Sequence, residues 1–365
     1  MNPFKMLRAV PSMLMVICLA FYFTACEGPA GPDGATGAAG TTGAAGVAGA
    51  KGDKGDPGDP GAAGTAGCIT CHDMSTDLVS RVDQWTSSVH NTGGTFERND
   101  AGCAPCHSHE GFREFQATGT VAAKIQNPTA IGCRTCHNIH TTYEKADFSL
   151  AVTGPVAFRA NFMAGKTYDK GKSNLCVSCH QPRDATLPVV GGPDFTIANS
   201  RFGPHHGPQG SLLAGYGGYE VPGSATYANT AHTTMISDGC VTCHMQEAFG
   251  RQSGGHTMKM AYDYHEVLTL NVAGCQSCHS GTKDFDVNGA VTEIEALGAQ
   301  LEALLVADGL LDEASGASKA GTWSANKTGA LWNYRMLFVE DRSGGVHNPK
   351  YAKALLTNSI ENYSN

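Results

Sequence analysis

The stretch Cys68-Ile-Thr-Cys71-His72 has a pattern, Cys-x-x-Cys-His, that recurs five more times along this chain of 365 residues. Successive copies begin 35, 30, 43, 64 and 35 residues apart, so they do not form a repeat of fixed length. The six copies contain twelve of the fourteen cysteines. The other five copies are Cys103, Cys106 and His107; Cys133, Cys136 and His137; Cys176, Cys179 and His180; Cys240, Cys243 and His244; and Cys275, Cys278 and His279.

This pattern predicts covalent haem attachment. Two thiols three positions apart can each form a thioether with one porphyrin, and the histidine that follows is held under the iron as its proximal ligand. Cys-x-x-Cys pairs also hold structural zinc, and cysteines of exported proteins commonly form disulfides, but neither explains a histidine after every second cysteine. We therefore expect six haem c groups on the twelve motif cysteines. The expected proximal ligands are His72, His107, His137, His180, His244 and His279.

The region 68–285 is predicted to hold the haems. The 212 residues from Cys68 to His279 leave roughly 35 residues for each haem, which is too little chain to build a large apolar core. We expect the porphyrins to form the core, and their removal to leave no stable fold. The predicted fold is mainly α-helical and irregular with little sheet, in which short helices and loops surround a stack of haems.

Residues 286–365 carry no further motif and are predicted to be helical. A second helix is expected near residues 330–339, and Asn348 and Pro349 provide a cap and first-turn pair for a last helix towards Ile360. We expect this segment to pack on the haem region; packing against another subunit is the alternative. The first helix is indicated by apolar residues that share one helical face: Val291, Ile294, Leu297, Leu301, Leu304 and Leu305.

The first 25 residues have the features of a signal peptide. Lys5 and Arg8 precede an apolar stretch, residues 13–23, which is too short for a lasting transmembrane helix. The following Phe23-Thr24-Ala25-Cys26 resembles a bacterial lipobox, in which Cys26 would become lipidated, although that box usually has Leu where Phe23 stands. We expect export, with plain cleavage as the alternative to lipidation.

Residues 26–67 are predicted to form a collagen-like stalk. Glycine occupies every third position from Gly28 to Gly67, an unbroken run of thirteen Gly-x-y triplets. Strict period three is what the crowded axis of a collagen triple helix demands. A flexible tether of small residues is the alternative. Either form would hold the haem region away from a membrane, and only the first would make the protein a trimer.

The charge of the chain indicates which partners it disfavours. Removal of the leader changes the formal net charge from −8 to −10, because 23 basic residues then face 33 acidic ones. Such a surface repels nucleic acid and anionic lipid headgroups. We therefore expect no nucleic-acid partner and no membrane contact except through a lipid anchor. The charge favours cationic partners or metal ions, or serves only solubility.

Nine further histidines are available for the distal side of the irons, more than six haems require. His140 follows His137 by three residues, so both would project from one short turn towards different irons. His109 is too near His107 in sequence to bend onto the same iron, and His109 and His265 fit an ordinary hydrogen-bonding role equally well. The other distal candidates are His90, His140, His205, His206, His232, His256 and His347.

Three stretches resemble bacterial extracellular multihaem cytochromes. They are Arg201-Phe-Gly-Pro-His205-His206-Gly-Pro-Gln209 with Gly217-Gly-Tyr219-Glu220, Cys240 to Met245 with Gly254-Gly-His256-Thr-Met258, and Gly345-Val-His347-Asn-Pro349-Lys-Tyr351. The resemblance covers residues 68–360 in pattern, and its last stretch is also related in style to the pentahaem nitrite reductase superfamily. It implies that His205 or His206, His232, His256 and His347 are distal ligands.

The nearest functional analogues in this resemblance are filament-forming surface cytochromes of metal-reducing bacteria. They imply a protein at the outer-membrane surface or outside the cell. It would accept electrons from periplasmic or outer-membrane cytochromes and pass them along bis-histidine haems to external acceptors such as metal oxides. In such filaments a histidine of one subunit can complete a haem of the next. The collagen-like stalk departs from that family, so a trimer and a filament both remain open.

The alternative function is enzymatic: a multihaem reductase of nitrite, hydroxylamine or a sulfur oxyanion with one open iron. Its catalytic haem would commonly have lysine in place of the motif histidine, whereas all six motifs here end in histidine. Surplus histidine also allows every iron to be closed, which suits electron transfer. The sequence therefore favours an electron carrier over an enzyme, and makes an adhesive collagen-like fibre a minor third reading.

Overall fold

The computed structural model describes residues 72, 75–92, 97–205 and 207–364, all within the second of the two compact units of the chain, residues 60–365. The leader, Cys26, the Gly-x-y segment, Cys68, Cys71 and His206 lie outside the described residues. Within that described part, no helix is long and apolar enough to cross a membrane.

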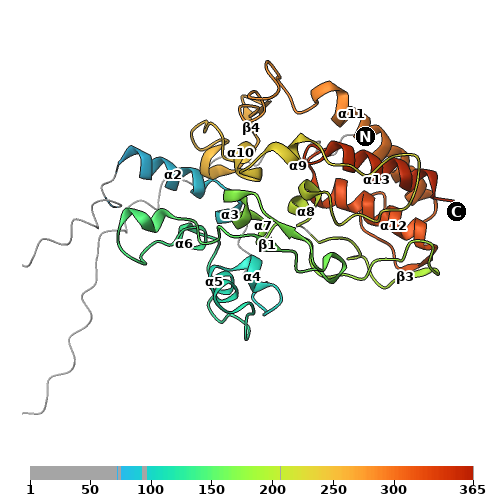
Figure 1. Ribbon diagram of the computed structural model, residues 1–365, viewed down its shortest axis with the longest axis horizontal. Coiled ribbons are helices and arrows are strands. Elements are labelled where there is room, and N and C mark those ends of the chain that lie inside the picture. The colour runs from blue at the N-terminus through green and yellow to red at the C-terminus, as the bar shows by residue number, and fades with distance from the viewer. Residues whose placement is uncertain (1–71, 73–74, 93–96, 206, 365) are drawn as a thin grey trace, which may run out of the picture. The chain divides into compact units, whose positions relative to one another are not determined.

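The region that contains the described motifs is built from short helices and loops (Figure 1). Helix α2 is the longest of them, and Ser75 caps it by accepting a hydrogen bond from the Leu78 N–H. The 3-10 turns are Lys145–Phe148, Asn161–Met163, Gly171–Ser173, Gly255–Thr257 and Val287–Gly289. The α-helices are α2 (Thr76–Thr86), α3 (Val89–Thr92), α4 (Ala104–His107), α5 (His109–Thr118), α6 (Cys133–Cys136), α7 (Asn174–Val177), α8 (Gln209–Ala214), α9 (Ala231–Met235) and α10 (Gly239–His244).

Sheet is confined, in the described residues, to three antiparallel two-stranded pairs. Strand β1 (Val156–Ala157) pairs with β2 (Thr167–Tyr168), and β4 (Ala261–Tyr264) pairs with β5 (Val267–Leu270) in a hairpin. Strand β3 (Phe195–Ile197) pairs with β6 (Gly321–Trp323), which joins the motif region to the C-terminal segment. The predicted fold class, mainly α-helical and irregular with little sheet, is confirmed.

Three long helices form the C-terminal segment, as the sequence predicts. They are α11 (Ala290–Ala307), α12 (Ala325–Tyr334), which continues as a π-helix over Arg335–Asp341, and α13 (Pro349–Glu361). Pro349 stands in the first turn of α13, but the Asn348 side chain does not cap it. Its amide instead donates to the Leu212 carbonyl and to Asn229 Oδ1, so Asn348 ties α13 to the loop after α8.

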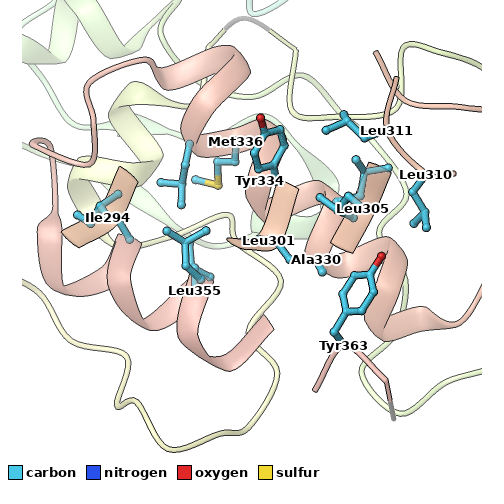
Figure 2. Packing of buried hydrophobic residues seen from close by; sticks show 14 of the residues in the cluster. Ile294, Leu301, Leu305, Leu310, Leu311, Ala330, Tyr334, Met336, Leu355 and Tyr363 are labelled. Atoms are coloured by element: carbon cyan, nitrogen blue, oxygen red, sulfur yellow. The ribbon is translucent and has the colours of Figure 1, made fainter. Parts of the chain in front are cut away.

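These helices enclose an apolar core made of protein side chains (Figure 2). Leu301 and Leu305 of α11 are fully buried against Leu331 of α12 and Leu355 of α13, and Ile197 and Leu212 join the same cluster from the motif region. The expectation of a porphyrin core concerns the motif region; the C-terminal segment has a core of protein side chains, so the expectation that haem removal leaves no stable fold does not take this core into account. This segment holds no haem motif, and its 18-residue helix α11 is long enough to present a continuous apolar face.

Candidate functional site: paired histidines beside the Cys-x-x-Cys-His segments

Each motif that the structure describes in full forms one helical turn. The His137 N–H donates to the Cys133 carbonyl at 2.9 Å, and the His279 N–H donates to the Cys275 carbonyl at 2.8 Å. The same bond joins His107 to Cys103 and His180 to Cys176. Because residues three apart lie on the same face of a helical turn, the two thiols of each motif point to the same side. None of the ten described motif cysteines is in a disulfide.

Among the described residues, five motif histidines are seen to face a second histidine from elsewhere in the chain. The separation of the ring centroids varies little, from 6.1 to 6.3 Å, although the tilt between the rings ranges from 24° to 85°. The five partners are all distal candidates from the sequence. The pairs are His72 with His140, His180 with His90, His137 with His256, His279 with His232, and His244 with His347.

This separation fits one metal ion between the two rings. An imidazole nitrogen lies about 1.1 Å from its ring centroid and binds a transition metal at about 2 Å, so two axial imidazoles place their centroids roughly 6.2 Å apart. In the described residues, no group of three or more His, Cys, Asp or Glu side chains is placed to hold a metal ion. Two imidazoles on opposite sides are the protein ligands that an iron needs when a porphyrin supplies the other four.

Apolar side chains lie exposed beside these pairs. Val89, next to His90, is 69% exposed, and Met235, one helical turn after His232, is 78% exposed. Exposed apolar side chains beside a binding group are what a flat apolar ligand would cover. The surroundings of the pairs therefore also fit a porphyrin.

The second ring nitrogen of several paired histidines is fixed by an oxygen acceptor. Nδ1 of His137 bonds to the Phe148 carbonyl at 2.7 Å, and Nδ1 of His232 bonds to the Val346 carbonyl at 2.7 Å. A carbonyl oxygen only accepts, so Nδ1 carries the proton and Nε2 keeps its lone pair for the facing position. Three more paired histidines follow this pattern: His244 with the Met258 carbonyl at 3.0 Å, His180 with Gln209 Oε1 at 3.3 Å, and His347 with Asp341 Oδ1 at 2.6 Å.

For most of the paired histidines whose pKa is shifted, the surroundings lower the pKa and so favour the neutral imidazole, which is the form that binds a metal. Burial, reinforced by His180, lowers the pKa of His90 to about 4. Burial also lowers the pKa values of His244 and His256. His347 differs: burial acts to lower its pKa, but the Asp341 carboxylate and its hydrogen bond outweigh burial, and the pKa is raised.

His137 and His140 belong to two different pairs, although they are three residues apart. His137 faces His256, and His140 faces His72. His140 has a φ of +66°, a left-handed conformation that is uncommon for a residue with a side chain and is often found at functional sites. This backbone turn directs the two rings to separate partners, as the spacing predicts.

The remaining candidates are placed differently. His109 Nδ1 bonds to Thr135 Oγ1 at 3.0 Å, and its N–H donates to the Thr129 carbonyl, so it joins the second and third motifs. His265 lies in the turn of the β4–β5 hairpin against Tyr264, with ring centroids 4.4 Å apart. His205 lies in the loop before α8 with a φ of +51°, and its neighbour His206 is outside the described residues.

Sequence reasoning missed the groups that hold the histidines. Asp341 lies six residues before His347, but nothing in the sequence separates it from the other acidic residues. Arg159, whose Nη2 donates to Cys106 Sγ at 3.0 Å, was also missed. The carbonyls of Phe148, Met258 and Val346 could not have been found, because every residue has one.

The comparisons with known proteins agree with the two-part organisation of the sequence. Residues 25–69 match the family model of the collagen triple helix repeat. The C-type polyheme cytochrome OmcB of Geobacter sulfurreducens is 24% identical over 318 residues, which cover 73% of this chain and 42% of that protein. The C-type polyheme cytochrome OmcC of the same organism is 25% identical over 232 residues, which cover 52% of this chain and 30% of that protein. The chain thus spans less than half of these relatives, and no solved structure matches it. The chain is a distant relative of polyhaem c-type cytochromes, with a collagen-like segment ahead of the motifs.

Proposed function

We propose that this protein is an exported hexahaem c-type cytochrome that carries electrons between haems and passes them to an acceptor outside the cell. The observation that carries the proposal is the set of five histidine pairs at one constant separation, each with a motif histidine on one side. The relatives in Geobacter, which are polyhaem cytochromes by name, support the same class.

Each residue of a site would have its own role in holding the haem. The two motif thiols would form thioethers with the porphyrin edge, the motif histidine would bind the iron from one side, and the facing histidine would bind it from the other. When bound, each haem supplies an iron that alternates between two oxidation states. The oxygen acceptors on Nδ1 hold the rings in place, so little rearrangement is needed when an electron arrives or leaves.

Two protein ligands for each iron favour an electron carrier over a reductase. A reductase needs an iron position that a substrate can enter, and the five pairs would close that position at five sites. For the sixth site, at His107, we assign His205 or His206 as the second ligand, since the other candidates are paired or, in the case of His109 and His265, bonded and packed elsewhere. This assignment completes the set within one chain.

Location and assembly belong to the same proposal. The leader would export the chain, Cys26 would anchor it by lipidation to the outer membrane, and the Gly-x-y segment would form a trimeric stalk. Its collagen triple helix repeat supports self-association. Donors would be periplasmic or outer-membrane cytochromes, and acceptors would be extracellular oxidants such as metal oxides. A filament of stacked subunits is the competing assembly.

The test uses the purified, haem-loaded chain. Its mass should exceed that of the polypeptide by six haems, the reduced spectrum should be low-spin, and added carbon monoxide should leave it unchanged. Binding of carbon monoxide, nitrite or hydroxylamine to the wild-type protein would overturn the closed-iron proposal in favour of the reductase. Deletion of residues 28–67 should convert a trimer to a monomer by mass in solution; a monomer before deletion, or filaments after it, would refute the stalk.

A further inference from the structure

The fourth motif contacts the second motif through their cysteines. Cys179 Sγ donates to the carbonyl of Pro105, the residue before Cys106, at 3.6 Å. Arg159 bridges the same two segments, with Nη2 at 3.0 Å from Cys106 Sγ and at 2.8 Å from the Ser178 carbonyl.

The segment that leads into the fourth motif contacts the fifth motif. The Tyr168 hydroxyl lies 3.8 Å from Cys240 Sγ, and Lys172 Nζ donates to Asp238 Oδ2 at 3.0 Å. Ser173, just before the fourth motif, accepts a hydrogen bond from the Val241 N–H at 3.2 Å. The fourth motif and its lead-in segment thus contact two different neighbours.

The third motif reaches the fourth through helix α2. The His256 N–H donates to Gln84 Oε1 at 3.0 Å, so the partner of His137 rests on α2. Six residues after Gln84, the same segment provides His90, the partner of His180.

The two outer motifs each have one such neighbour. His140, from the turn after the third motif, faces His72 of the first motif. At the other end, the backbone of Gly274 abuts the fifth motif so closely that a Cβ there would lie 2.9 Å from the Cys243 Cα. The sixth motif, which begins at the next residue, therefore packs directly on the fifth.

We propose that the segment Cys176–His180 is the junction of a branched relay. One line runs through the motifs in the order first, third, fourth, fifth and sixth, and the second motif forms a side arm on the fourth. The links of the second motif to the third, from His109 to Thr135 and Thr129, run through side chains and backbone that would bind neither a porphyrin nor an iron. Because each motif would be bonded to a porphyrin edge through its two cysteines, contact between two motif segments brings their porphyrins close together. The chain then has three ends, at His72, His279 and His107, instead of the two ends of a linear wire.

The side arm gives electrons an exit at the second motif, in addition to the two ends of the main line. Helix α4 lies within the second motif and packs against α5, which follows it (Figure 1), and the half-buried Cys103 and His107 are on this arm. An electron that enters at the first motif can leave by the sixth or by the second, with the choice made at the fourth. The inference rests on the proposed function only in requiring a haem at each motif.

Iron positions in the intact holoprotein test the branch directly. Anomalous scattering at the iron edge, or a cryo-EM map, should show that the iron at His180 has three near neighbours, at His107, His137 and His244. The iron at His107 should have only one. An iron at His180 with two neighbours, or an iron at His107 that lies between two others, would overturn the branch.

Two variants identify which iron belongs to which motif without relying on the path of the polypeptide in the map. In Cys103→Ala/Cys106→Ala, the missing iron should be the one that neighbours only the junction. In the matched variant Cys275→Ala/Cys278→Ala, the missing iron should be the one beyond the His244 iron, and any other lost position contradicts the order. Binding of carbon monoxide would refute the proposal that every iron has two protein ligands, but it would not change the iron positions. If mass spectrometry shows no haem on Cys176–His180, the proposed junction itself is overturned.

Discussion

Asp341 accepts a hydrogen bond from Nδ1 of His347 at 2.6 Å, and its carboxylate is fully shielded from solvent. The four other fixed imidazoles bond to neutral oxygens, so this pair is distinct among the described sites. A carboxylate that accepts the Nδ1–H bond makes the imidazole a stronger electron donor and would stabilise an oxidised iron. The site of His244 and His347 should therefore have a lower potential than its neighbours.

Asp341→Asn should raise the midpoint potential of one haem. Replacing a charge-assisted hydrogen bond with a neutral one weakens it by about 1 kcal/mol, which corresponds to roughly 40 mV for a one-electron couple. Spectropotentiometric titration measures the change. Asp312→Asn is the matched control, because that carboxylate bonds to the exposed Ser315 instead of to a histidine. Superimposable titration curves for Asp341→Asn and wild type would contradict the role of Asp341.

His90→Ala should open one iron. His90 is the partner of His180, so its loss leaves that site with one protein ligand, and the reduced variant should bind one equivalent of carbon monoxide. The readout is the carbon monoxide difference spectrum together with the high-spin fraction. His265→Ala, in the β4–β5 turn, should leave both unchanged. A His90→Ala protein that remains entirely low-spin would show that His90 is not a ligand.

Arg159→Gln should lower the potentials of the haems at the second and fourth motifs. Its guanidinium contacts Cys106 Sγ and the Ser178 carbonyl, and a positive charge there favours the reduced, more electron-rich irons. Loss of that charge should shift two haems downward by tens of millivolts, roughly 1 kcal/mol each at an effective dielectric constant near 20. Arg251→Gln removes a charge from the exposed pair with Asp83 and should leave the titration unchanged. A shift confined to one haem would argue against Arg159 lying between two.

The turn that carries His140 should loosen at low pH. Asp147 accepts hydrogen bonds from the Thr142 hydroxyl and from the N–H groups of Thr141, Thr142 and Tyr143, and these bonds hold its pKa below the usual range. Because the pKa of Asp147 is lower in the folded chain than in the unfolded chain, where it is near 4, the ionised carboxylate stabilises the folded turn at pH values above about 4. That stabilisation is lost as the pH falls through the pKa of the folded state. The protection factors for amide exchange at residues 141–147, each taken relative to the intrinsic exchange rate at the same pH, should fall in acid.

Asp147→Asn should reproduce that loosening at neutral pH, because an amide accepts these N–H bonds less well than a carboxylate. Asp286→Asn is a comparable control, since Asp286 holds the start of α11 in the same way but lies away from His140. Exchange at residues 141–147 that is independent of pH and of the Asp147 substitution would count against the role of this carboxylate.

The haem-free chain should keep part of its structure. Leu301, Leu305 and Leu355 belong to a core of protein side chains, so α11, α12 and α13 should remain helical when the motif cysteines are replaced by alanine. Hydrogen exchange should show protection over residues 290–361 and little over residues 75–285. Leu301→Ala in the same background should remove much of that protection, since truncation of a fully buried leucine costs about 2–5 kcal/mol. Uniform exchange along the haem-free chain would show that this core does not fold alone.

The motifs and the set of distal candidates were accessible from sequence because Cys-x-x-Cys-His and a surplus of histidine are local features. The pairing was not, since His137 and His256 are joined by a fold with few regular elements. Only the link between His137 and His140 could be predicted, because it depends on a three-residue spacing. The apolar face of α11 was predicted from its spacing of apolar residues. The size of the core that it forms with α12 and α13 was underestimated, because the chain was expected to pack mainly around porphyrins. The buried role of Asn348 could not be deduced, since the same residue type before a proline usually caps the helix.

The packing of Cys106 against Arg159 and of Cys179 against Pro105 has a consequence for biogenesis. If the chain is exported and loaded with haem as proposed, unmodified motif cysteines in an oxidising compartment would be prone to form disulfides instead of thioethers. Haem should therefore reach the second and fourth motifs before the chain compacts around these cysteines, while their thiols are kept reduced. A cell without a thiol reductant in that compartment should accumulate disulfide-linked, haem-poor protein.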